Sequence, residues 1–126
     1  MFRSPIAKAF YNARAADGSH AESCGIWVEK EHHVGVKLCD MGGLENSIEY
    51  MKGKGIDISE EVGTQITKEL VDGADKVVVM AEEEIWPDYL KNNPKVMAWD
   101  VPNPDAISAE DAQQVGDQIT ELLKTI

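Results

Sequence analysis

Apolar residues recur at helical spacing in three segments of the chain. From Ser4 to Arg14, a serine suited to capping and a first-turn proline lead into an apolar stripe. A second stripe begins at Leu44 and ends at Gly53, where glycines suit helix termination. A third follows Ser108, which resembles the start of a capping box. These patterns predict a helix near each end of the chain and one between them.

Runs of β-branched and other apolar residues predict strands. Residues 76–80 are typical of a strand buried on both faces, and residues 94–99 predict a last strand. Residues 21–28 and 34–38 predict two shorter strands. Strands that alternate with helices indicate an α/β fold in which a mostly parallel sheet is flanked by helices.

Two short helices are expected beside the strand at residues 76–80. Thr67 can cap a short helix before this strand, and residues 82–92 predict a helix after it. Pro87 lies within the second segment, and proline is tolerated only near the first turn of a helix. We therefore expect a short helix there rather than a long one.

The composition suits one globular domain over residues 1–126. The chain is 43% hydrophobic and 28% charged, and 126 residues suffice for a single core. Its formal net charge of −11 repels nucleic-acid backbones and anionic lipid surfaces, so we expect no nucleic-acid or membrane partner. Any anion site must therefore arise from a local group of residues.

The two cysteines, Cys24 and Cys39, show neither the spacing of a zinc site nor that of a disulfide framework. We expect reduced thiols, no metal and no cofactor. The sequence shows no secretory signal pattern and no apolar run near the roughly 20 residues that span a bilayer. These features favour a cytoplasmic location.

The amino-terminal residues resemble a known signature. The first ten residues are Met1-Phe2-Arg3-Ser4-Pro5-Ile6-Ala7-Lys8-Ala9-Phe10. They are similar to the second half of the signature of the low-molecular-weight protein tyrosine phosphatase family, in which a cysteine, five residues and an arginine are followed by Ser-Pro and an alanine-containing helix. Further similar segments follow in order: Ser23-Cys24-Gly25, Gly55-Ile56-Asp57-Ile58-Ser59, Gln65-Ile66-Thr67 and Val101-Pro102-Asn103-Pro104.

The resemblance implies a three-layer fold with a four-stranded parallel sheet, whose first strand leads into a phosphate-binding loop. Met1 corresponds to a position inside that loop, so the first strand and the nucleophilic cysteine of the family are expected ahead of Met1. A start codon assigned too far downstream, or deliberate shortening, would produce this pattern. Without that strand, residues 21–28 and 76–80 lack their shared neighbour, and we expect a homo-oligomer formed through unpaired strands.

The resemblance also assigns roles to individual residues. Phe2, Arg3 and Ser4 would bind phosphate: backbone N–H groups surround the anion, the Arg3 fork contacts two of its oxygens, and the Ser4 hydroxyl stabilises the cysteine thiolate. The family's general acid is an aspartate, but Asn103 stands at its position, and an amide cannot donate that proton. Asp100 and Asp105 flank Asn103 and are candidate substitutes.

The function implied is that of a hydrolase that removes phosphate from phosphotyrosine proteins or other phosphomonoesters through a cysteinyl-phosphate. Because the nucleophile is absent, we expect the given chain to be inactive, with phosphate or a similar oxyanion as its ligand. The alternative is a non-catalytic anion-binding or structural module. An arsenate reductase is disfavoured because no cysteine follows the third strand, between Ala81 and Trp99.

Overall fold

The protein is a mixed α/β domain in a computed structural model that describes residues 3–102 and 107–126. Phe2, Asn103 and Asp105 of the expected site therefore lie outside the described residues. Within these residues, the regular elements are four α-helices, three single-turn 3₁₀ helices and two parallel strands. The predicted α/β class is confirmed at this level.

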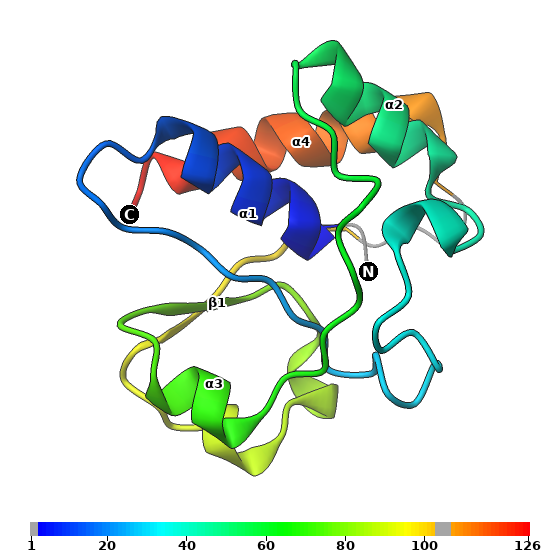
Figure 1. Ribbon diagram of the computed structural model, residues 1–126. Helices are drawn as coiled ribbons and strands as arrows, with labels where there is room; N and C mark the ends of the chain where they lie inside the picture. Colours follow the sequence, from blue (N-terminus) through cyan, green and yellow to red (C-terminus); the bar gives the residue numbers. More distant parts are fainter. Residues whose placement is uncertain (1–2, 103–106) are drawn as a thin grey trace.

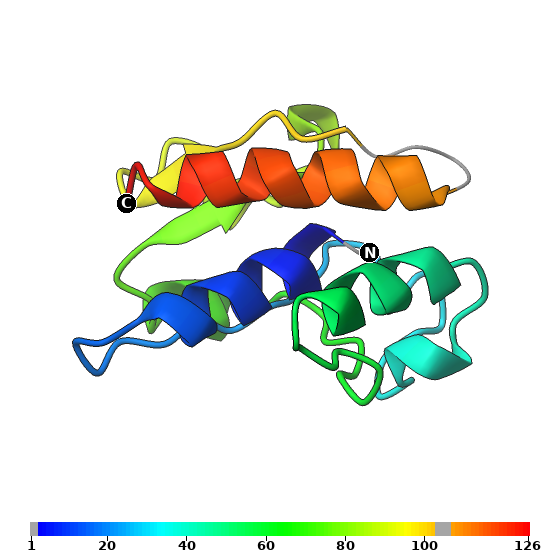
Figure 2. The same cartoon turned by 90° about the horizontal axis from the view of Figure 1, so that it is seen from above.

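Three helices contribute to the larger core, together with residues of the segments between them. Helices α1 (Arg3–Arg14) and α2 (Glu45–Gly53) both lie along α4 (Ala109–Leu123), α1 over its carboxyl-terminal part and α2 over its amino-terminal part (Figures 1 and 2). One fully buried side chain from each helix, Ile6, Met51 and Ile119, joins the same apolar cluster. All three predicted helices are therefore confirmed, and their apolar stripes face one another.

The predicted caps at Ser108 and Thr67 are also present, whereas Ser4 lies inside α1 and not before its first residue. The Ser108 side chain accepts a hydrogen bond from the Asp111 amide, and the Asp111 carboxylate accepts one from the Ser108 amide, which completes the capping box of α4. Thr67 caps helix α3 (Lys68–Asp72) by accepting from the Leu70 amide at 3.2 Å. These local bonds satisfy amides that a helix leaves unpaired at its first turn.

The sheet consists of β1 (Val77–Val79) and β2 (Val96–Ala98), which pair in parallel. The Val77 amide donates to Lys95 at 3.0 Å, and the Trp99 amide donates to Val79 at 2.9 Å. The two predicted strands and their parallel direction are confirmed, although both are shorter than expected. A second apolar cluster lies around Val79, Ile66, Val71 and Leu90.

The predicted strands at residues 21–28 and 34–38 are wrong. The first contributes only one parallel bridge, between Gly25 and Gln65, before the chain turns at residues 26–32. The second is interrupted by Gly35, whose φ of +75° turns the backbone out of an extended path. These segments contact residues 62–65 at isolated points, so they add no strand to the sheet.

The helix predicted at residues 82–92 is also wrong. The segment forms two separate 3₁₀ turns, η2 (Glu83–Ile85) and η3 (Asp88–Leu90), and the remaining 3₁₀ turn is η1 (Leu38–Asp40). Pro87 precedes η3 and has no N–H to continue a helix from the first turn. The proline therefore divides the segment instead of opening one helix.

Candidate functional site

The candidate site begins at Arg3, the first residue of α1. Its side chain is buried, with 8% of the residue exposed, and Nη1 donates to two backbone carbonyls: Met80 at 2.6 Å and Val101 at 2.7 Å. Met80 directly follows β1, and Val101 lies shortly after β2. Arg3 therefore joins the start of α1 to the carboxyl ends of both parallel strands, which is the edge where ligands bind in α/β sheets.

The packing of α1 fixes this position. Pro5 and Ile6 in the first turn are buried, and Ile6 belongs to the same apolar cluster as Val101. The helix is twelve residues long, so its amino-terminal end carries a partial positive charge that favours an anion. The helix end and the Arg3 guanidinium are therefore both positive, and both lie at the start of α1.

Electrostatics leave Arg3 charged but partly desolvated. Burial lowers the pKa of the Arg3 guanidinium, while the negative charge of Glu82 acts in the opposite direction. An arginine retains its proton in such a site, because its pKa starts far above neutrality. Both bonds use Nη1, and Nη2 and Nε are the two nitrogens with which a guanidinium can contact an oxyanion edge-on.

Ser4 and Asp100 are the other expected site residues within the described chain. Ser4 is half-buried beside Arg3. Asp100 is exposed, and its backbone carbonyl accepts from Gln118 Nε2 at 2.7 Å. Asp100 is the residue before Val101, whose carbonyl accepts a hydrogen bond from Arg3.

Neither cysteine has the features of an activated nucleophile in this arrangement. Cys24 is half-buried against the cluster around Val79, and burial raises the pKa of its thiol, which favours the protonated form. Cys39 is an exposed free thiol in η1. Across the part of the chain that the structure describes, no three His, Cys, Asp or Glu side chains are grouped to hold a metal ion. Among the same residues, no helix is long and apolar enough to cross a bilayer.

Sequence reasoning missed three groups around Arg3: the carbonyls of Met80 and Val101, and the carboxylate of Glu82. Backbone carbonyls give no signal in a sequence, since every residue has one. Glu82 follows β1 closely in the chain, and an acidic residue just beyond the carboxyl end of a predicted strand was the one available signal.

Comparison with known proteins adds no relative: no protein-family model and no curated protein matches this chain. The resemblance of the amino-terminal residues to a phosphatase signature therefore rests on the residues themselves.

Proposed function

We propose that the amino-terminal end of α1 is an oxyanion site of the low-molecular-weight phosphatase type, with a phosphomonoester such as phosphotyrosine as its ligand. Arg3 supplies the guanidinium fork, and Ser4 supplies a hydroxyl and a backbone N–H. The observation that supports the proposal is the anchoring of Arg3 at the carboxyl ends of β1 and β2, at the positive end of a helix.

The two carbonyl contacts hold the arginine in place before any anion binds. Nη1 is engaged by Met80 and Val101, so the guanidinium plane is held while Nη2 and Nε remain as donors. A donor pair fixed in advance loses less side-chain entropy on binding than a mobile surface arginine does. The site therefore suits a compact anion in spite of the net charge of −11.

The proposal includes the family's larger architecture. Val77 and Val79 bond to β2, so the N–H and C=O of Val78 between them face the other edge of β1. In the three-layer fold that we propose, a further strand occupies this edge, and a second copy of the chain is one source for it. The proposal also includes a cytoplasmic location. It assigns Asn103, Asp105 or Asp100 to the position of the family's general acid.

We expect no hydrolysis of an aryl phosphate by the 126-residue chain. A cysteinyl-phosphate forms when a thiolate attacks phosphorus and the alcohol leaves, and Cys24 is half-buried with a raised pKa. The rate at which p-nitrophenol is released from p-nitrophenyl phosphate measures the hydrolysis. Turnover above that of an Arg3→Ala control would contradict the expectation.

Binding of inorganic phosphate tests the proposed site. In ¹⁵N-labelled protein at low ionic strength, phosphate should shift the amide signals of Ser4 and Ile6 in a saturable way. Arg3→Lys keeps the charge but removes the fork, and we expect it to weaken binding by about tenfold. Arg14→Lys, the same change at the other end of α1, is the matched control and should leave these shifts nearly unchanged.

The second candidate function is a non-catalytic module in which Arg3 serves only to join α1 to the sheet. Its support is the same pair of bonds from Nη1, which is what a purely structural arginine would make. The phosphate titration separates the two functions. Equal shifts in Arg3→Lys and Arg14→Lys, or none at Ser4, would contradict the oxyanion site and favour the structural role.

A further inference from the structure

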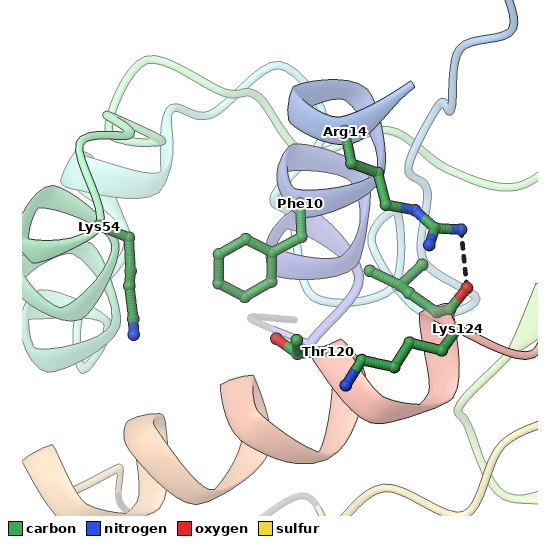
Figure 3. Close-up of a pocket in the computed structure, with 6 residues that line it drawn as sticks. Phe10, Arg14, Lys54, Thr120 and Lys124 are labelled. Carbon is green, nitrogen blue, oxygen red and sulfur yellow. Dashed lines mark hydrogen bonds between the residues drawn. The ribbon is translucent and has the colours of Figure 1, made fainter. Parts of the chain in front are cut away.

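A separate hollow of about 340 Å³ lies at the other end of α1, where α1, the end of α2 and α4 converge (Figure 3). Its lining consists of one aromatic, one aliphatic, one hydroxyl and three basic side chains: Phe10, Leu123, Thr120, Arg14, Lys54 and Lys124. A volume of this size lies at the lower end of the range of small-molecule sites, roughly 300–1,000 Å³.

The charge of this hollow is opposite to that of the protein. The chain has 12 basic and 23 acidic residues, yet the lining contains three of the basic residues and none of the acidic ones. Arg14 ends α1, and Lys54 and Lys124 are the carboxyl-terminal caps of α2 and α4. Each helix end carries a negative charge of about half a unit, so the three cations exceed what the helix ends offset.

The contacts that these cations already make leave donors available. Arg14 donates through Nη2 to the Leu123 carbonyl at 2.7 Å, as the dashed line in Figure 3 shows, and also to the Ile126 oxygen at 3.4 Å, so both bonds use the same nitrogen. Lys54 lies over the Tyr50 ring, 5.6 Å from its centroid. Lys124 pairs with Glu121 at 3.0 Å, but both side chains are more than half exposed, and such pairs contribute little.

The hollow also offers apolar surface for the body of a ligand. Phe10 and Leu123 contribute it, and Phe10 is held edge-on against Tyr50 with ring centroids 6.4 Å apart. Figure 3 shows the Phe10 ring between Lys54 on one side and Thr120 and Lys124 on the other. An apolar body beside cationic groups matches a molecule that has a ring at one end and an anionic group at the other.

We propose that this hollow binds a small aromatic carboxylate, with its ring against Phe10 and its carboxylate between Lys54 and Lys124. The site is distinct from the Arg3 site, because Arg3 and Arg14 stand at opposite ends of a helix about 18 Å long. The proposal does not depend on phosphate binding at Arg3, and either site can fail without the other.

The test uses 2-naphthoate as the probe and the neutral 2-naphthamide as its matched control. Addition of 2-naphthoate to ¹⁵N-labelled protein should give saturable shifts of the Phe10 and Thr120 amides, while 2-naphthamide binds several-fold more weakly. The exposed Lys54 and Lys124 can be changed without loss of the core. Lys54→Gln and Lys124→Gln should each weaken binding by about threefold, and the double variant by about tenfold.

Lys91→Gln removes an exposed lysine that does not line the hollow, and it should leave the affinity for 2-naphthoate unchanged. Any of four results would overturn the proposal. The first two are equal affinity for the acid and the amide, and an unchanged affinity in the double variant. The others are shifts confined to residues away from the hollow, and an absence of saturable shifts at millimolar probe.

Discussion

Arg3→Met is expected to lower the free energy of unfolding by about 2–3 kcal/mol. Methionine keeps an apolar stem of similar length but cannot donate to the carbonyls of Met80 and Val101. The Val101 carbonyl is buried and would lose a bond from a charged donor, which is more costly than losing a bond at the surface. Urea denaturation followed by circular dichroism measures the change, with the slope of the transition as a check on cooperativity.

The matched control for Arg3→Met is Arg14→Met on the same helix. Arg14 is exposed and its contacts lie at the end of α4, so the expected change is within about 1 kcal/mol. Equal losses for the two variants would contradict the anchoring role of Arg3. A loss confined to Arg3→Met would show that the bonds to the strand ends contribute to stability.

Ile119→Ala is expected to cost about 2–5 kcal/mol, the largest effect of any substitution considered. Ile119 is fully buried on α4, in the cluster to which α1 and α2 also contribute. Alanine removes three carbons from the side chain and leaves a cavity that three helices would have to close. Because a domain of this size is typically stable by only 5–15 kcal/mol, the transition midpoint in urea should move to much lower concentration.

Leu70→Ala is the control for this core substitution. Leu70 lies in α3 and is 45% exposed, so its truncation removes less apolar surface from contact and leaves no enclosed cavity. The expected change is below about 1 kcal/mol. A loss for Leu70→Ala as large as that for Ile119→Ala would place the main core elsewhere than between α1, α2 and α4.

The helices could be predicted from the sequence because their signals are local. Thr67 and Ser108 accept hydrogen bonds from amides three residues away. The apolar stripes of α1 and α4 each mark the face of the helix that packs in the core. The strands required more than local information. Residues 34–38 contain suitable residues, but Gly35 turns the chain and only single bridges to residues 62 and 63 form.

The candidate site, too, could be predicted from the sequence only in part. Arg3 could be selected from the sequence because Ser4 and Pro5 follow it in a known pattern. The two hydrogen bonds that anchor Arg3 could not be predicted, because their acceptors are backbone carbonyls that lie 77 and 98 residues away along the chain. Likewise, the hollow at Phe10 brings together the ends of three helices, which have no shared pattern in the sequence.

A crystal structure with bound tungstate, a phosphate-like anion with strong anomalous scattering, tests the oxyanion site most directly. The account predicts an anomalous peak within hydrogen-bond distance of Arg3 Nη2 or Nε and of the Ser4 amide, with Nη1 still bonded to Met80 and Val101. Tungstate seated only beside Lys54 and Lys124, or no peak at the amino-terminal end of α1, would contradict it.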